Sequence, residues 1–169
     1  METVQRYCVA AWWSSGKAGL ARSTSAPNAI HFTAPPAFGG VEGRWTPEDL
    51  LLCAIASCFT TTFHALAENS KFEYADLEVE VEAMVSKTDS GYSFSEIMVR
   101  PKLTICREEE KTHALRLLQK SKTVCLISRT LSVEQKFTPC VQFANCSGKS
   151  GKFCRGPEEE PAHWIRDMK

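Results

Sequence analysis

Residues 46–66 decide the fold, and their sequence is TPEDLLLCAIASCFTTTFHAL. Thr46 is a favoured helix N-cap residue, Pro47 suits the first helical position, and Asp49 completes a near capping box. From Leu50 onward, apolar residues fall on every side of the helix that follows. Because a helix that is apolar all round must be buried, this stretch predicts a central core helix.

Extended segments are predicted on both sides of this helix, at residues 4–13, 19–23, 29–33, 77–85, 92–105 and 131–137. In the fourth segment, apolar residues alternate with Glu78, Glu80 and Glu82. We therefore expect one face of this strand to be exposed to solvent and the other to be buried. The fifth segment returns as its hairpin partner, and Pro101 indicates an edge strand or a bulge there. A second helix follows the hairpin and carries Cys125 on its buried stripe. This order of elements predicts an α+β protein.

Length and charge exclude several classes of protein. The chain has 169 residues, which is enough for one domain with its own core. Its 20 basic and 20 acidic residues give zero formal charge, so we expect no nucleic-acid partner. The threonines at 60–62 interrupt the longest apolar run, so we expect no membrane-spanning segment and no membrane partner. The first residues lack the pattern of a secretory signal, which leaves the cytoplasm as the expected location.

Cys58 and Cys125 allow two interpretations from the residues alone. Each lies on a predicted buried helix, where a cysteine ordinarily serves as a small apolar side chain. A peroxidatic thiol that forms a sulfenic acid, with a second thiol that condenses into a disulfide, would use the same two residues. Sequence spacing does not show whether the two sulfurs meet, so both interpretations stay open here.

The last thirty residues raise a separate question about metal. Cys140, Cys146, Cys154 and His163 follow the spacing C-x5-C-x7-C-x8-H, which has no close CxxC pair and matches none of the usual structural zinc sites. We therefore expect no metal and no cofactor. The alternative is that this C-terminal segment is functional and that its cysteines bind a metal ion or a partner.

Two motifs resemble the OsmC/Ohr family of thiol-dependent peroxidases. That family has Pro-Glu-x-Leu followed by small-small-Cys-Phe, with the cysteine ten residues after the glutamate, and Glu48 and Cys58 fit this pattern. A second family cysteine, late in the next helix, matches Cys125 within KTVCLIS at residues 122–128. The resemblance covers residues 1–138, which predicts an OsmC-like domain there and a C-terminal extension of unknown role at 139–169.

The resemblance implies an intertwined homodimer with antiparallel sheets packed around two central buried helices. Family members reduce organic hydroperoxides, and some are re-reduced by lipoylated or other dithiol proteins. The resemblance implies that Cys58 is the peroxidatic thiol and Cys125 the resolving thiol. It also implies that Glu48 helps to hold a cationic partner of the thiolate. Ten helical residues rise about 15 Å, so Glu48 should reach Cys58 of the partner subunit or act through a bridging cation.

The chain departs from the family at the arginine that activates the thiol. One branch of the family places it after a glycine in the first turn, where this chain has Lys17 after Gly16. Lysine lacks the two-pronged geometry of guanidinium, so the exchange is not conservative. Arg22 and Arg44 are other candidates, and all three cations could equally be ordinary solvated charges.

The sequence thus supports two hypotheses about function. The first is a thiol peroxidase in which Leu51, Ile55 and Phe59, near Cys58 on the central helix, favour alkyl or lipid hydroperoxides over hydrogen peroxide. The second is a non-catalytic protein of the same fold that binds a small apolar ligand at the dimer interface, which the missing arginine favours. The pKa of the Cys58 thiol separates the two hypotheses.

Overall fold

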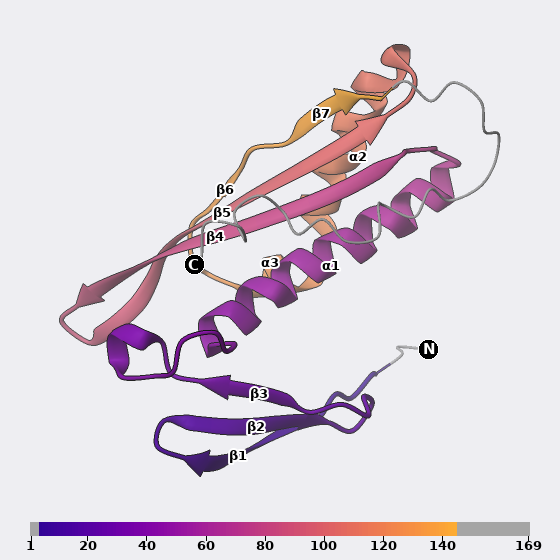
Figure 1. The fold of residues 1–169 in the computed structure, drawn as a ribbon. Coiled ribbons are helices and arrows are strands. Elements are labelled where there is room, and N and C mark those ends of the chain that lie inside the picture. Colours follow the sequence, from indigo (N-terminus) through magenta and orange to yellow (C-terminus); the bar gives the residue numbers. More distant parts are fainter. Residues whose placement is uncertain (1–3, 145–169) are drawn as a thin grey trace. The chain divides into compact units, whose positions relative to one another are not determined.

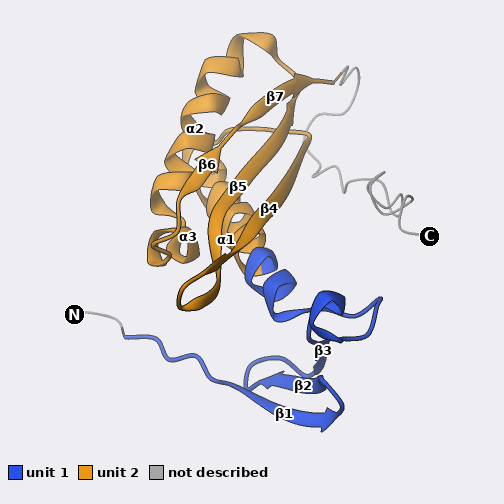
Figure 2. Cartoon of the chain, turned by 90° about the vertical axis from the view of Figure 1, so that its left-hand side faces the viewer, with its two compact units in different colours: residues 1–53 blue, residues 54–169 orange. Residues whose placement is uncertain are grey.

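The computed structural model describes residues 4–144, which divide into two compact units (Figure 2). Unit 1 ends at Cys53, and unit 2 begins at Ala54. The long helix α1 (Pro47–Ser70) starts in unit 1 and continues in unit 2. The predicted domain at residues 1–138 therefore holds two clusters of contacts, and its boundaries stay a prediction.

Unit 1 contains an antiparallel sheet of three strands in chain order (Figure 1): β1 (Val9–Ser15), β2 (Ala18–Ser23) and β3 (Ile30–Thr33). These are the first three extended segments that the sequence predicts, although β1 begins later than expected. Gly16 connects β1 to β2 with a φ of 53°, a left-handed conformation that glycine adopts without strain. A short 3-10 turn, η1 (Pro36–Phe38), lies between β3 and α1.

Helix α1 begins with the predicted capping box. The Asp49 carboxylate accepts hydrogen bonds from the Thr46 backbone N–H and hydroxyl, both at 2.8 Å, and the Thr46 hydroxyl accepts one from the Asp49 N–H at 3.1 Å. These bonds satisfy N–H groups that the first helical turn leaves without partners. The helix ends at Ser70, and the next residue, Lys71, has a φ of 53° that turns the chain out of the helix.

Unit 2 contains a mixed sheet around the central strand β5 (Gly91–Ile105). Strand β4 (Asp76–Thr88) pairs with it antiparallel, as the predicted hairpin. On the other side of β5, both β6 (Gln135–Phe137) and β7 (Cys140–Phe143) run parallel to it. The expectation of antiparallel sheets therefore holds for unit 1 and for the hairpin, whereas β6 and β7 make the second sheet mixed. Strand β7 also shows that this sheet continues past residue 138.

Pro101 does not mark an edge strand, because it lies in the central strand. It pairs with Val79 of β4 on one side, and on the other side β6 pairs only as far as Val99 while β7 begins its pairing at Lys102. A missing N–H is tolerated at this junction because Pro101 falls between the two pairing segments. The irregularity in the hairpin lies instead at Met84 and Val85.

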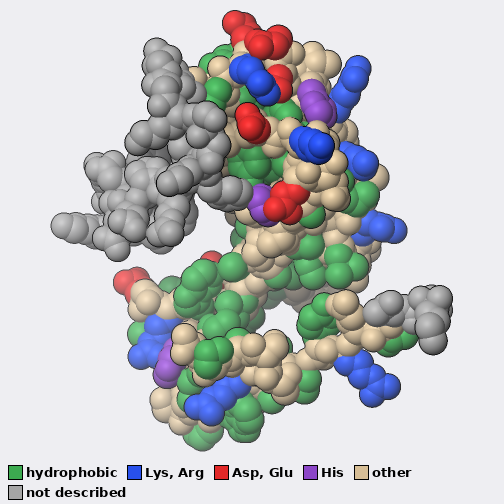
Figure 3. All heavy atoms as spheres, turned by 90° about the vertical axis from the view of Figure 1, so that its right-hand side faces the viewer, with side chains coloured by type: hydrophobic (Ala, Val, Ile, Leu, Met, Phe, Trp, Pro, Cys, Tyr) green, Lys and Arg blue, Asp and Glu red, His purple; other side chains and the backbone are tan. Residues whose placement is uncertain are grey.

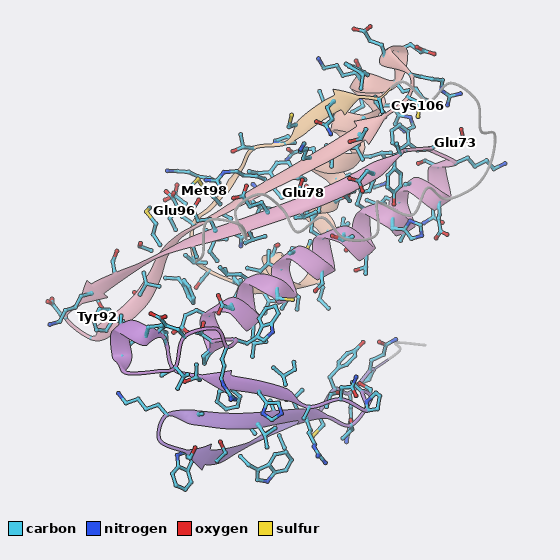
Figure 4. The ribbon with its side chains drawn as sticks, in the orientation of Figure 1. Glu73, Glu78, Tyr92, Glu96, Met98 and Cys106 are labelled. Atoms are coloured by element: carbon cyan, nitrogen blue, oxygen red, sulfur yellow. The ribbon has the colours of Figure 1, made fainter. Side chains whose placement is uncertain are left out.

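The two faces of this sheet differ in chemistry, as the alternation in β4 predicts. The charged face carries ion pairs of Lys102 with Glu78 at 3.7 Å and of Arg100 with Glu82 at 2.6 Å, and Figure 4 shows Glu78 on β4. Helix α2 (Lys111–Val124) contacts β5 and β7, and Phe59 of α1 packs against Phe137 of β6. The core of unit 2 consists of Ile55, Phe59, Phe63, Ala67, Phe72, Ile97, Val99, Leu103, Ile105, Ala114, Leu117, Leu118 and Cys125.

Helix α1 is also long and apolar enough to cross a membrane by length and composition, with a window of 18 residues at a mean hydropathy of 1.7. The expectation that no segment meets this test is wrong, because the threonines at 60–62 interrupt the apolar run without adding charge. In this structure Ile55, Phe59 and Phe63 of α1 are core residues of unit 2. In the single chain 22% of that window is buried, so α1 contributes one face to the core and is not buried all round as the sequence predicts.

Candidate functional site

Cys58 lies near the middle of α1, on a partly exposed face of the helix. Its neighbours Ile55 and Phe59 are fully buried, whereas Cys58 itself is half-buried and carries a free thiol. Phe59 packs against Phe137 of β6 with ring centroids 5.8 Å apart. The core contacts of α1 therefore fix the position of Cys58 while its sulfur stays accessible.

Cys125 lies at a break between two helices, which differs from the single continuous helix that the sequence predicts. Helix α2 ends at Val124, and the short helix α3 (Leu126–Thr130) follows. Cys125 has a ψ of 115°, so the helical hydrogen-bond ladder stops there and leaves the N–H groups of the next residues without helical partners. The N–H groups of Leu126 and Ile127 instead donate to the sulfur of Cys58.

Two side chains complete the surroundings of the Cys58 sulfur. The hydroxyl of Thr62, one helical turn further along α1, donates to it, and so does the thiol of Cys125. Burial raises the pKa of the Cys58 thiol, but the hydrogen bonds from Ile127, Cys125, Thr62 and Leu126 together lower the pKa below its ordinary value. Hydrogen bonds to the charged form favour that form, so the site stabilises a Cys58 thiolate.

The Cys125 thiol has the opposite tendency. Cys125 is 0% exposed, and its burial raises the pKa of the thiol. The Ser128 hydroxyl donates to its sulfur at 3.4 Å, which lowers the pKa, while the hydrogen bond and the charge of Cys58 raise it. The net pKa of Cys125 is raised. The pair therefore consists of one sulfur suited to be a thiolate and one suited to remain a protonated donor.

The other predicted site residues lie in unit 1, and their contacts lie there too. The ammonium of Lys17 donates to the backbone carbonyl of Phe38. Arg22 belongs to β2, and Arg44 is exposed shortly before α1. Glu48 lies in the first turn of α1, and its Oε2 is the one buried side-chain oxygen or nitrogen without a hydrogen-bond partner in the described part of the chain. A role for Lys17 or Glu48 at the sulfur stays a prediction.

The residues expected to favour alkyl substrates need a correction. Ile55 is 0% and Phe59 is 1% exposed, so both point into the core and neither is open to a substrate. Leu126, whose backbone N–H interacts with the Cys58 sulfur, is an apolar residue that is 66% exposed. The tail residues considered as metal ligands, other than the exposed Cys140, lie outside the described residues. Within residues 4–144, no group of three His, Cys, Asp or Glu side chains could hold a metal ion.

Sequence reasoning missed Thr62 and Ser128. Thr62 lies four residues after Cys58, the spacing at which helical side chains share a face, so this signal was available in the sequence. Ser128 depends on the break at Cys125, which the amphipathic pattern of residues 108–125 does not reveal. The amides of Leu126 and Ile127 meet Cys58 only through tertiary contact, so no local signal could have found them.

The elements and their order define an α+β fold that solved structures share. An organic hydroperoxide resistance protein from Elizabethkingia anophelis has a TM-score of 0.69 and 19% identity, with 84% of this chain and 100% of that chain covered. An OsmC-like protein of unknown function from Vibrio cholerae has a TM-score of 0.71 and 14% identity, with 80% of this chain and 99% of that chain covered. This is the OsmC fold.

The sequence comparisons agree with the fold. Residues 40–139 match the model of the OsmC-like protein family, and the chain belongs to this family. It is also 31% identical over 88 residues to YmaD, an uncharacterized protein of Bacillus subtilis, and this match spans 50% of the chain and 59% of YmaD. The resemblance stated from the two cysteine motifs is thus confirmed, and the family includes organic hydroperoxide resistance proteins.

Proposed function

We propose that this protein is a thiol-dependent peroxidase that reduces organic hydroperoxides, with Cys58 as the peroxidatic and Cys125 as the resolving residue. The observation that carries the proposal is the interaction between the two thiols, in which the pKa of Cys58 is lowered and that of the buried Cys125 is raised. A peroxidatic thiol must be a thiolate to attack an O–O bond. A resolving thiol must lie close enough to condense with the product of that attack.

In the first step, the Cys58 thiolate attacks the terminal oxygen of the hydroperoxide. A sulfur–oxygen bond forms and the O–O bond breaks, so that the alkoxide leaves with the electron pair and takes a proton to become the alcohol. Cys58 is then a sulfenic acid. The N–H groups of Leu126 and Ile127 and the hydroxyl of Thr62 hold the sulfur in its anionic form before the attack.

In the second step, the Cys125 sulfur attacks the sulfur of the sulfenic acid. A disulfide forms between Cys58 and Cys125, and the hydroxyl group leaves with a proton as water. A dithiol reductant then reduces the disulfide, as two thiols are oxidised for each hydroperoxide reduced. The raised pKa of Cys125 keeps this residue protonated until the proton can pass to the leaving group.

Organic hydroperoxides are favoured over hydrogen peroxide by the exposed side chain of Leu126. The backbone N–H of Leu126 interacts with the reacting sulfur, and its exposed side chain would bind the alkyl part of a substrate, at about 25 cal/mol for each Å² removed from water. Hydrogen peroxide has no such part to bury. The names of the solved relatives, which include organic hydroperoxide resistance proteins, support the same class of substrate.

Glu48 and Lys17 form the second part of the proposal. A buried carboxylate oxygen without a partner is unfavourable, and a cation beside it would remove this cost. Glu48 would hold such a cation near a Cys58 thiolate, with Lys17, Arg22 or Arg44 as its source. This arrangement would add to the hydrogen bonds that the sulfur already receives.

A homodimer in the cytoplasm is the proposed form of the enzyme. The buried residues of helix α1 in unit 2 lie on one face, at Ile55, Phe59, Phe63 and Ala67. The face opposite carries the small residues Ser57, Thr61 and Ala65, all exposed in the single chain. Hydrophobic side chains also occupy much of the surface drawn in Figure 3. A second copy would cover such surfaces, and sedimentation equilibrium tests this point.

The experiment that tests the function is the consumption of cumene hydroperoxide with dithiothreitol as reductant. We expect turnover by the natural chain, no turnover by Cys58→Ser, and in Cys125→Ser a sulfenic acid on Cys58 that dimedone traps for mass spectrometry. Cys140→Ser is the matched control, because Cys140 is also a free thiol of unit 2 but lies exposed on β7. An inert Cys58 with an ordinary or raised pKa would support the alternative, a protein of this fold that only binds an apolar ligand.

A further inference from the structure

The outward side of α2 and α3 collects cations in a part of the chain that has no acidic residue. Residues 111–133 contain no Asp or Glu. Four cations of this stretch, which we call the basic face, are exposed or half-buried: Arg116, Lys120, Lys122 and Arg129. Figure 3 shows Lys and Arg side chains projecting along one side of the upper part of the view. The whole chain has zero formal charge, so this excess of positive charge is a local feature.

The packing of α2 turns these cations away from the core. The buried stripe of this helix consists of Ala114, Leu117, Leu118 and Ser121. Arg116 and Lys120 are exposed on the outward side, one helical turn apart. Arg129 of α3 lies beside the end of α2, because Lys122 and Arg129 line the same hollow of about 290 Å³. The basic face therefore runs along α2 and continues onto α3.

The cations on the sheet of unit 2 are paired with carboxylates, which the basic face lacks. The pairs on the sheet are Arg100 with Glu82, Lys102 with Glu78 and Lys136 with Glu96. No cation of the basic face forms an ion pair with another residue of the described range 4–144. Arg116 and Lys120 are moreover like charges at positions i and i+4, which is unfavourable in a helix. An anionic partner would offset this unfavourable arrangement.

Large apolar side chains are exposed among the same cations. Leu115 is 37%, Val124 is 41% and Leu126 is 66% exposed. Leu115 precedes Arg116, and Val124 follows Lys120 by one helical turn. Cations with exposed aliphatic side chains between them are typical of helices that bind at the interface of an anionic membrane.

We propose that the basic face binds the surface of an anionic lipid bilayer. Clusters of four or more Lys and Arg on an amphipathic helix bind anionic headgroups, and each cation near the surface strengthens binding about fivefold. Leu115, Val124 and Leu126 would enter the headgroup region. The expectation of no membrane partner came from the search for a spanning segment, and binding at a surface needs none. The inference does not depend on the proposed peroxidase function, since this binding uses neither thiol.

Nucleic acid, an acidic protein and a second copy of the chain are the competing partners. Proteins that bind single-stranded nucleic acid combine cations with aromatic side chains on which bases stack, whereas this face has aliphatic ones. The cations also extend along a helix instead of converging on one groove, since Arg116 and Lys120 do not line the hollow. Two copies of the same face would repel each other. A lipid surface fits a charged helix side of this kind best.

Sedimentation with lipid vesicles tests the inference. The protein is mixed at low salt with phosphatidylcholine vesicles that contain either no phosphatidylglycerol or about one third of it. We expect binding to the anionic vesicles alone, and weaker binding as salt is added. Arg116→Gln/Lys120→Gln should weaken this binding about 25-fold, and Arg129→Gln alone about fivefold.

A matched control separates the basic face from net charge. Lys87→Gln/Lys102→Gln removes the same charge from exposed positions on β4 and β5. Binding by this variant should stay within about twofold of the natural protein, because charges away from the bilayer are screened. All the substituted positions are exposed, so each variant should keep the circular dichroism of the natural protein.

The remaining outcomes overturn the inference. No binding, equal binding to both kinds of vesicle, or equal losses in the two double variants would each do so. Tighter binding of polyuridylate or of poly-L-glutamate than of the anionic vesicles, lost in Arg116→Gln/Lys120→Gln, would assign the face to nucleic acid or to an acidic protein. A changed oligomeric state of this variant in sedimentation equilibrium would assign it to a second copy. Turnover of cumene hydroperoxide without vesicles should be unchanged in Arg116→Gln/Lys120→Gln, so the two proposals fail separately.

Discussion

The thiols of Cys58 and Cys125 interact, and the pKa of Cys58 is lowered while that of Cys125 is raised. Burial raises the pKa of Cys58, but hydrogen bonds together lower it by more, with that of the Ile127 amide ahead of that of the Cys125 thiol; burial is the first cause of the raised pKa of Cys125. Two thiols that were both inert core residues would each have a pKa raised by burial. The lowered pKa of Cys58 supports a role as the peroxidatic thiol.

Thr62→Val should raise the pKa of the Cys58 thiol, because valine has nearly the shape of threonine but no hydroxyl to donate to the sulfur. Iodoacetamide alkylation of Cys58 against pH, followed by mass spectrometry of the peptide, measures this pKa. Thr62→Ser keeps the hydroxyl and should keep the pKa close to that of the natural protein. If Thr62→Val and Thr62→Ser give the same pKa, the hydroxyl does not act on the sulfur.

The stability of the protein should depend on pH through Cys58. Its folded pKa lies below the unfolded one, so folding favours the thiolate. The stabilisation is fully present above the unfolded pKa and is lost as the pH falls through the folded pKa. Urea unfolding of the natural protein and of Cys58→Ser should therefore show a difference in free energy that grows as the pH rises through this window.

The contribution of Cys125 to the free energy of unfolding depends on pH in the opposite direction, which gives a control for that measurement. Its folded pKa is raised, so its contribution is present below the unfolded pKa and is lost as the pH rises through the folded pKa. The difference in free energy of unfolding between the natural protein and Cys125→Ser should thus shrink in alkaline solution. If the stability differences for Cys58→Ser and Cys125→Ser both grew as the pH rises, this would contradict the assignment of Cys58 as the thiolate and Cys125 as the thiol.

Phe59→Ala should destabilise the fold by about 3–5 kcal/mol, the usual cost of removing a buried phenylalanine. Its ring is 1% exposed and contacts Phe137, so the substitution leaves a cavity between α1 and β6. Lys120→Ala, at an exposed position of α2, should stay within about 0.5 kcal/mol. Urea denaturation measures both, and equal stability of the two variants would show that Phe59 is not a core residue.

Local signals in the sequence were enough to predict α1 and the β4–β5 hairpin. The Thr46–Asp49 capping box forms as its spacing predicts, and the glutamates of β4 lie on the charged face of the sheet. Such features depend on neighbours along the chain. Cys58 and Cys125 were found as candidates through the family motif, since nothing in their separation of 67 positions shows that the sulfurs meet.

The break at Cys125 could not be predicted, because the amphipathic stripe of α2 continues through that residue. The stripe reports which side chains are buried, and Cys125 is indeed buried, but it does not report a ψ of 115°. That one backbone angle frees the amides of Leu126 and Ile127 for the Cys58 sulfur. The periodicity and the motif spacing of the sequence therefore could not predict the part of the site that depends on tertiary contact.

Glu48→Gln should make the protein more stable if the carboxylate has no partner, and less active if the carboxylate holds a cation. The buried Oε2 of Glu48 has no hydrogen-bond partner, and replacing the carboxylate by a neutral amide removes a cost on the order of 1 kcal/mol. If Glu48 holds a cation beside the thiolate, the same change should raise the pKa of Cys58 and lower kcat/KM for cumene hydroperoxide. Asp49→Asn is the matched control, because it weakens the capping box and should lower stability by about 1 kcal/mol without moving the Cys58 pKa. A Glu48→Gln variant with unchanged kinetics and an unchanged Cys58 pKa would remove Glu48 from the site and leave the hydrogen bonds of Thr62 and the α3 amides as the means of activation.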